Sequence, residues 1–108
     1  MNEAAVRLES LLLFAVLMAA PSARAQDAPA LMKRYDCYIC HADDQTKTGP
    51  AFTDVAAKYR GDSKAAAKLT AVVRKGRHGS GPWPMPPLPQ VPNADAAKMV
   101  DYILSLGK

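Results

Sequence analysis

Cysteine, histidine and long apolar runs are scarce in this sequence of 108 residues. Two cysteines allow one disulfide at most, which excludes the multi-disulfide framework of many small secreted domains. The longest uncharged apolar run covers residues 11–20, whereas a membrane-spanning helix needs about 20 residues, so stable membrane insertion is not expected. Basic residues are interleaved with aspartates rather than clustered beside aromatics, so nucleic-acid binding is not expected either.

The apolar run at residues 11–20 has the setting of a secretory signal peptide. It is followed by the small-residue pattern Ala-Arg-Ala at residues 23–25, which is typical of a cleavage site. We therefore expect a signal peptide over residues 1–25, cleaved after Ala25, and a mature domain over residues 26–108 in the periplasm. An N-terminal anchor or a buried helix is the alternative for this segment.

The expected mature chain is small and basic. Removal of residues 1–25 leaves 83 residues, a size at which an apolar core alone gives marginal stability and a metal, disulfide or cofactor is often added. The formal net charge of +4 stays with the mature part, because the arginines and glutamates of the signal cancel. This charge favours acidic partners or anionic cofactor groups without indicating a particular fold.

Hydrophobic spacing predicts an all-α domain of four helices without a convincing strand. The first two are expected at about residues 29–35 and 54–59. The third follows Asp62 and Ser63 as N-cap candidates and stops at Gly76, and the fourth runs from an Asn93 cap to Gly107. The apolar stripe of the third helix comprises Ala65, Leu69, Val72 and Val73, and that of the fourth comprises Ala96, Met99, Val100, Ile103 and Leu104.

Residues 79–92 form a proline-rich segment between the last two expected helices. They hold six of the nine prolines of the chain and its only tryptophan, Trp83, so neither a helix nor a central strand is expected there. A disordered linker or a ligand for a polyproline-binding domain are alternatives. We favour a stiff, ordered loop, because the segment contains the tryptophan and precedes a strong helix that must fold back.

The segment Cys37-Tyr38-Ile39-Cys40-His41 forms a C-x-x-C-H motif, the pattern of covalent haem attachment. Each thiol adds across one haem vinyl group to form a thioether, and the two intervening residues set the distance between the sulfurs. His41 then lies beneath the iron, where one ring nitrogen forms an axial bond and the other donates to a backbone carbonyl. We therefore expect one haem c, with its iron, attached through Cys37 and Cys40.

Three other interpretations of the motif are weaker. A disulfide is the ordinary expectation for two cysteines in an exported chain, but the adjacent histidine favours haem attachment. A thioredoxin-like redox pair would need a βαβ context, which this sequence does not predict. A zinc site would need His78 as its fourth ligand, because the chain offers no further Cys or His.

The second axial position of the iron is either open, for gas or peroxide chemistry, or closed by a side chain. The candidates are Met32, His78, Met85 and Met99. We expect Met32, just before the motif, and Met99, on the stripe of the last helix, to lie in the core. Met85 is the favoured ligand, because three flanking prolines remove backbone freedom that ligation would otherwise cost. His78 is the alternative.

Four segments of the sequence resemble, in this order, the small bacterial class I cytochromes c. They are residues 37–41 (CYICH), 48–52 (TGPAF), 54–59 (DVAAKY) and 83–87 (WPMPP). The resemblance extends over about residues 28–106, which is essentially the whole expected mature chain.

This resemblance implies a helical shell around one haem, with the first and last helices crossing. It implies that Cys37 and Cys40 are the thioether anchors and that His41 and Met85 are the axial ligands. It also implies that the Pro50 carbonyl accepts a hydrogen bond from His41 Nδ1–H, and that Trp83 lies near a haem propionate.

An iron with both axial positions filled has no site for substrate, so the expected function is one-electron transfer rather than enzymatic catalysis. We expect a monomeric periplasmic carrier between a respiratory donor and a terminal reductase or oxidase. Basic side chains that are candidates for steering these redox partners are Lys33, Arg34, Lys47, Arg74, Lys75 and Arg77. The alternatives are a redox subunit docked permanently on a dehydrogenase, and a haem enzyme or gas sensor with an open or His78-closed site.

Overall fold

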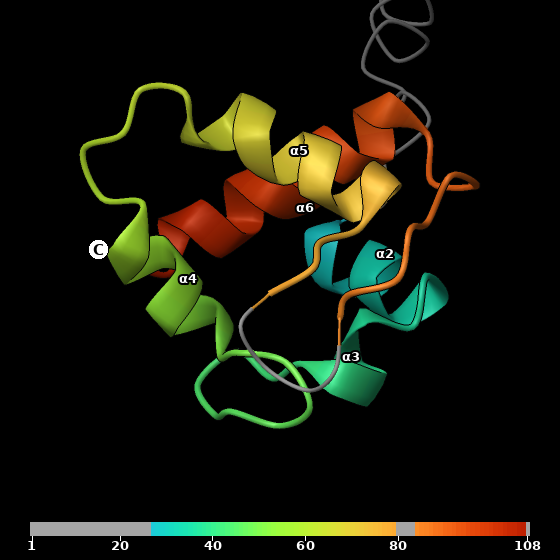
Figure 1. The fold of residues 1–108 in the computed structure, drawn as a ribbon, viewed down its shortest axis with the longest axis horizontal. Coiled ribbons are helices and arrows are strands. Elements are labelled where there is room, and N and C mark those ends of the chain that lie inside the picture. The colour runs from blue at the N-terminus through green and yellow to red at the C-terminus, as the bar shows by residue number, and fades with distance from the viewer. Residues whose placement is uncertain (1–26, 80–83, 108) are drawn as a thin grey trace, which may run out of the picture.

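The computed structural model describes residues 27–79 and 84–107, which form a helical domain. With the labels of Figure 1, its helices are α2 (Ala28–Arg34), α3 (Cys37–Cys40), α4 (Phe52–Lys58), α5 (Ala65–Lys75) and α6 (Asn93–Ser105). Within these residues β pairing is limited to one isolated antiparallel bridge between Arg77 and Met85. The all-α prediction is confirmed for the described residues, and none of the helices they form is long and apolar enough to cross a membrane.

The helix ends have local causes. The Asp27 side chain caps α2 by accepting from Ala30 N at 2.9 Å, and proline in the first turn costs no hydrogen bond there. Helix α5 ends at Gly76, whose φ of 76° is favourable only for glycine.

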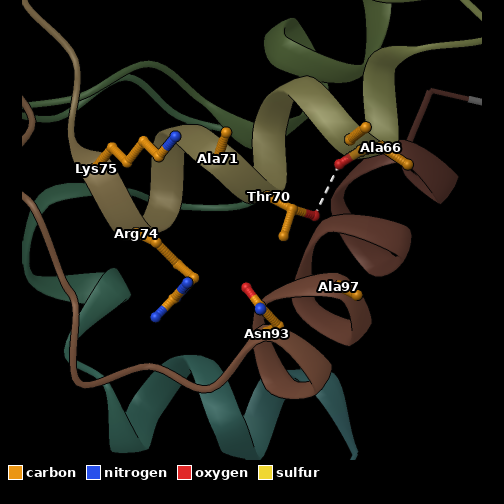
Figure 2. A pocket seen from close by; sticks show the side chains of 8 residues that line it. Ala66, Thr70, Ala71, Arg74, Lys75, Asn93 and Ala97 are labelled. Carbon is orange, nitrogen blue, oxygen red and sulfur yellow. Dashed lines mark hydrogen bonds between the residues drawn. The ribbon is translucent and has the colours of Figure 1, made fainter.

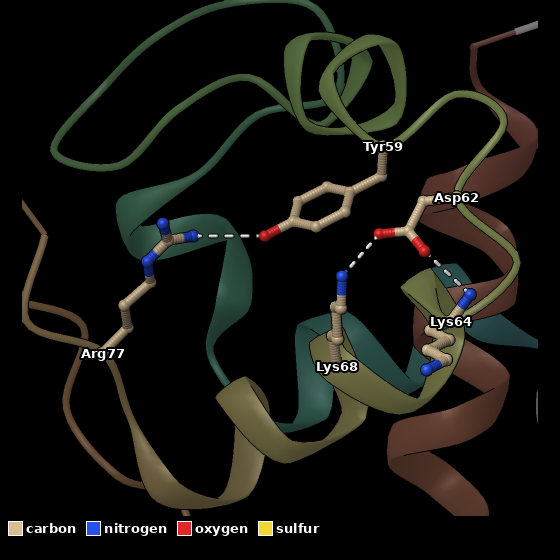
Figure 3. Close-up of polar contacts among 5 residues, drawn as sticks. All are labelled: Tyr59, Asp62, Lys64, Lys68 and Arg77. Carbon is tan, nitrogen blue, oxygen red and sulfur yellow. Dashed lines mark hydrogen bonds and ion pairs between the residues drawn. The ribbon is translucent and has the colours of Figure 1, made fainter.

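The N-caps predicted for two helices are wrong. The helix expected after Asp62 and Ser63 begins at Ala65 behind Lys64, and no side chain caps it. The Asp62 carboxylate closes the preceding turn instead, accepting from Lys64 N at 2.8 Å and from Lys68 Nζ at 2.7 Å (Figure 3). Asn93 is the first helical residue of α6 rather than its cap, because the rigid Pro92 already occupies the extended N-cap position.

The core lies where α6 packs against the other long helices. Figure 1 shows α5 lying along α6, with α4 near the C-terminal end of α6, and α6 also contacts α2. The buried core side chains are Leu31, Met32, Phe52, Leu69, Val73, Val91, Ala96, Met99, Val100 and Ile103. The two predicted helical stripes are therefore largely confirmed, although Val72 and Leu104 at their margins are only half-buried.

Tyrosine–aspartate hydrogen bonds join the two ends of the domain. Tyr35 at the end of α2 donates to Asp95 in α6 at 2.8 Å. Tyr102 in α6 donates to Asp43, just beyond α3, at 2.7 Å, and Tyr38 in α3 donates to the other carboxylate oxygen of Asp43 at 3.1 Å. These bonds raise the pKa of Tyr35 and of Tyr102, because only the protonated hydroxyl can donate to the carboxylate.

Candidate haem site

The short helix α3 presents the two cysteines of the C-x-x-C-H motif. It follows α2 through Asp36, whose φ of 62° turns the chain sharply, and it holds Cys37 and Cys40 one helical turn apart. Both thiols are free rather than joined in a disulfide, and both residues are half-buried. Burial raises the pKa of the Cys37 thiol.

The His41 ring is fixed at the end of α3. Its Nδ1 lies 2.8 Å from Pro50 O, and since a carbonyl only accepts, Nδ1 carries the proton and the neutral ring has its lone pair on Nε2. The ring stacks on Phe52 with centroids 4.8 Å apart and planes 21° apart. A Cβ built on Gly49 would collide with His41 Cε1, so only glycine fits beside this ring.

The loop after His41 returns to α3 and closes its carbonyl end. Gly49 N donates to Cys40 O at 2.7 Å, and Lys47 Nζ donates to Tyr38 O at 2.8 Å. Phe52 N donates to Ala42 O at 3.0 Å, and this bond connects the first residue of α4 to the same loop. The backbone that holds Pro50 is thereby tied to the helix that holds the cysteines.

The backbone of Met85 is pinned to the end of α5. Arg77 N donates to Met85 O at 3.0 Å, and Met85 N donates to Arg77 O at 2.9 Å. A Cβ on Gly76 would lie 2.7 Å from Met85 O and 2.8 Å from Pro87 N, so the proline segment crosses this glycine in close contact. The Met85 side chain is half-buried and packs against the core.

Arg77 also connects the Met85 segment to α4. Its Nη1 donates to Tyr59 OH at 3.4 Å, and Tyr59 packs against the core from the end of α4 (Figure 3). Residues 76–79 and 84–92 are thus an ordered connection over much of the predicted stiff loop. Trp83, expected near a haem propionate, lies outside the described residues, 27–79 and 84–107.

The rival ligands have distinct surroundings. Met32 and Met99 are 0% and 1% exposed and belong to the core, as predicted, and Tyr38 OH contacts Met32 Sδ at 3.7 Å. His78 is exposed on the segment after α5. Within residues 27–79 and 84–107 no group of three or more Cys, His, Asp or Glu side chains forms a metal site, so the zinc interpretation has no support there.

A groove of about 510 Å³ lies elsewhere, between α5 and α6. Figure 2 shows Arg74 and Asn93 lining it from the two helices, together with alanines of both helices and Thr70, whose hydroxyl donates to Ala66 O. No residue predicted to hold the haem or its iron lines this groove.

The described residues fit a covalently bound haem. Two free thiols lie one turn apart, and the following histidine has its Nδ1 committed and its Nε2 lone pair available. Apolar side chains remain half-buried against the core, which offers surface for a flat apolar group; they include Val55, Tyr59, Met85, Leu88, Leu104 and Leu106. Three contacts of this site were not predicted from the sequence: the stacking of Phe52 on His41, the sharing of Asp43 by two tyrosines, and the bond from Lys47 to Tyr38 O. The only sequence signal of such close packing is Gly49, directly before Pro50.

Known proteins match this chain over nearly all of the described residues. The family profile described as Cytochrome c matches residues 25–107. Cytochrome c-551 of Allochromatium vinosum is 44% identical over 96 residues, covering 86% of this chain and 98% of that protein. Cytochrome c-551 of Pseudomonas aeruginosa is 40% identical over 87 residues, covering 80% of this chain and 83% of that protein.

Solved structures resemble the fold closely. The crystal structure of Nitrosomonas europaea cytochrome c552 superposes with a TM-score of 0.70 at 39% identity, covering 72% of this chain and 98% of that one. The class 1 cytochrome MtoD of Sideroxydans lithotrophicus superposes with a TM-score of 0.65 at 30% identity, covering 75% of this chain and 94% of that one.

Proposed function

This chain belongs to the cytochrome c family and carries electrons on one covalently bound haem c, and we propose which residues hold that haem and where the protein works. Cys37 and Cys40 are the thioether anchors, and His41 is one axial ligand through Nε2. Met85 is the second axial ligand. The haem supplies one-electron exchange between Fe(II) and Fe(III), and these four side chains hold it in one position.

The observation that carries the ligand assignment is the anchoring of Met85. Its backbone makes two hydrogen bonds to Arg77, and its carbonyl lies against Gly76, so the end of α5 fixes the main chain from which the Met85 side chain extends. His41 is oriented in the same way by Pro50. A pair of ligands fixed before ligation costs little reorganisation when the iron changes charge, which suits rapid electron exchange.

We assign the remaining predicted contacts to the same site. The Pro50 carbonyl keeps His41 Nδ1 protonated, which makes the ring a stronger ligand through Nε2. Trp83 lies near a propionate group, as the resemblance implies. Replacement of Trp83 by Phe would leave Met85 ligation intact and change the titration of the propionates.

The cellular role that we propose is a monomeric periplasmic shuttle between a respiratory donor and a terminal reductase or oxidase. Residues 1–25 are the signal peptide and residues 26–108 the mature domain, and the charge of +4 favours brief contacts with acidic partners. Mass spectrometry of the periplasmic fraction tests this directly. A mature protein that begins at Gln26 and carries one haem supports the proposal, and a form anchored in the membrane contradicts it.

The ligand assignment is tested by spectroscopy of the exported holoprotein. We expect the oxidised protein to have the long-wavelength band of methionine-to-iron bonding and to resist carbon monoxide at neutral pH. Met85→Ala should abolish the band and admit carbon monoxide, whereas the matched variant His78→Ala should change neither. Rapid carbon monoxide binding by the unaltered protein would instead favour a gas sensor or an enzyme. Purification only in a complex with a dehydrogenase would favour a permanently docked subunit.

A further inference from the structure

Lys47 lies on the loop that closes α3, and its side chain, although exposed, is bonded to that helix. In a continued helix, Tyr38 O would accept from residue 42, but α3 ends at Cys40 and the chain is extended at His41, with φ −126° and ψ 157°. The Tyr38 carbonyl is therefore one of the terminal acceptors that a helix leaves without a partner. The Lys47 ammonium supplies that partner at 2.8 Å.

The backbone that carries this side chain is itself held close to α3. Lys47 N donates to Gly49 O at 3.0 Å, and Gly49 N donates to Cys40 O at 2.7 Å. The main chain is therefore bonded to the last residue of α3 at Gly49, two residues after Lys47. Among residues 27–79 and 84–107, no carboxylate forms an ion pair with Lys47. Asp43, the first carboxylate of the same loop, already accepts from Tyr38 and Tyr102.

The position of this charge matters because Tyr38 lies between the two cysteines. We propose that Lys47 is a positioning residue that fixes a positive charge on the haem-attachment helix and thereby raises the reduction potential of the haem. The inference rests on the proposed attachment through Cys37 and Cys40. Reduction adds one electron to the site, and a cation held close by stabilises the more negative of the two states.

The acceptor of this bond, the carbonyl of a residue between the two cysteines, separates Lys47 from the other basic residues considered for partner steering. A steering charge acts through the field around the whole protein and changes association rates. A charge fixed on α3 changes the equilibrium between the oxidised and reduced protein even when no partner is present. Steering is therefore measured by association rates, and the role proposed for Lys47 by the reduction potential of the isolated protein.

The test is spectroelectrochemical titration of purified holoproteins, after mass and spectrum have established one attached haem in each. Lys47→Gln removes the charge, Lys47→Arg keeps it, and Lys64→Gln removes an exposed charge before α5, a helix that does not contact α3. At low salt we expect Lys47→Gln to lower the ratio of reduced to oxidised protein roughly two- to fivefold at a fixed electrode potential. Lys47→Arg and Lys64→Gln should stay within experimental error of the unaltered protein.

A second measurement tests the positioning itself. Hydrogen exchange at the Gly49 amide should be faster in Lys47→Gln than in Lys64→Gln, because the loop loses its side-chain tie to α3. A potential in Lys47→Gln equal to that in Lys64→Gln overturns the proposal. So does a potential in Lys47→Arg as low as that in Lys47→Gln, because the charge would then not be the cause. A protein without attached haem would contradict the proposed attachment instead, which the initial mass measurement detects.

Discussion

Gly49 is a single residue on which the orientation of His41, the proposed axial ligand, depends. A methyl group at this position would collide with the His41 ring, which is held between Pro50 O and the Phe52 ring. We therefore expect Gly49→Ala to displace the ring and to weaken the histidine–iron bond. The free energy of unfolding should fall by about 1–3 kcal/mol, as in other overpacked sites.

A matched control for this substitution is Gly61→Ala. Gly61 has φ 80° and no atom within 4 Å of a built Cβ, so alanine there adds backbone strain without a steric collision. Circular dichroism of thermal unfolding should detect a loss of about 1 kcal/mol in Gly61→Ala. The visible spectrum should change only in Gly49→Ala, and an unchanged spectrum in that variant would contradict the packing argument.

Gly76 has the corresponding role for Met85, the proposed methionine ligand. Its φ of 76° disfavours any side chain, and a Cβ would lie 2.7 Å from Met85 O. We expect Gly76→Ala to push the proline segment away from α5 and to weaken the proposed bond between Met85 and the iron. Carbon monoxide binding to the reduced protein, followed by stopped-flow absorbance, should become at least about tenfold faster, equivalent to about 1.4 kcal/mol. A rate no faster than that of Gly61→Ala would contradict this role.

At the scale of elements, the turn before α5 gives a prediction about pH. The Lys68 ammonium, followed by the Lys64 backbone N–H, lowers the pKa of Asp62 below its ordinary value. A carboxylate whose pKa is lowered by folding stabilises the folded protein above its unfolded pKa, and the contribution is lost as the pH falls through the folded value. Asp62→Asn should therefore be less stable than the unaltered protein at pH 6.

This difference should shrink as the pH falls below about 4, the ordinary pKa of aspartate. Urea unfolding at a series of pH values measures it. Lys68→Ala should reduce the stability in the same direction and with the same pH dependence. A difference between Asp62→Asn and the unaltered protein that stays constant from pH 6 to pH 3 would mean that the ion pair is not its cause.

A hydrogen bond from Tyr102 to Asp43 connects α6 to the segment that follows α3. Tyr102→Phe removes the 2.7 Å bond to Asp43 while leaving the aromatic ring in place. We expect a loss of about 1 kcal/mol in the free energy of unfolding, typical of one hydrogen bond. The matched variant Tyr59→Phe removes only the long 3.4 Å contact with Arg77 and should cost less. Equal losses would indicate that the hydroxyl of Tyr102 is not specifically required.

The helices differ in how far the sequence predicted them. α5 and α6 were predicted well because each buries a repeating apolar stripe over three turns or more. α3 was not predicted, because four residues contain no repeat and its start depends on the left-handed Asp36. The misplaced starts of α5 and α6 have one cause: their N-cap positions, Lys64 and Pro92, make no side-chain bond that a sequence rule would recognise.

In the candidate site too, the features that follow from local sequence were predicted and those that depend on the path of the chain were not. The C-x-x-C-H motif and the bond between His41 and Pro50 were predicted, because the motif is local in sequence and the resemblance supplies the carbonyl. The bond from Lys47 to Tyr38 depends on the path of the loop, and the stacking of Phe52 depends on where α4 begins. Neither the loop path nor the start of α4 follows from residue type alone.

At the scale of the whole molecule, the net charge of +4 gives a prediction about small redox reagents. Oxidation of the reduced protein by hexacyanoferrate, an anion, should slow as ionic strength rises, because screening removes a favourable encounter. Oxidation by a cationic cobalt complex should accelerate over the same range. Stopped-flow absorbance measures both rates, and a salt dependence of the same sign for both reagents would exclude steering by net charge.

The tyrosine–aspartate bonds between the two ends of the domain bear on the order of folding. Tyr35 and Asp95 are 60 positions apart in the chain, and Asp43 and Tyr102 are 59 positions apart. Contacts so distant in sequence close large loops, whose entropic cost must be met before the contacts contribute. We therefore expect the local turns of α3 and α5 to form before α6 docks, and the rate of folding to depend on how often α6 meets α2.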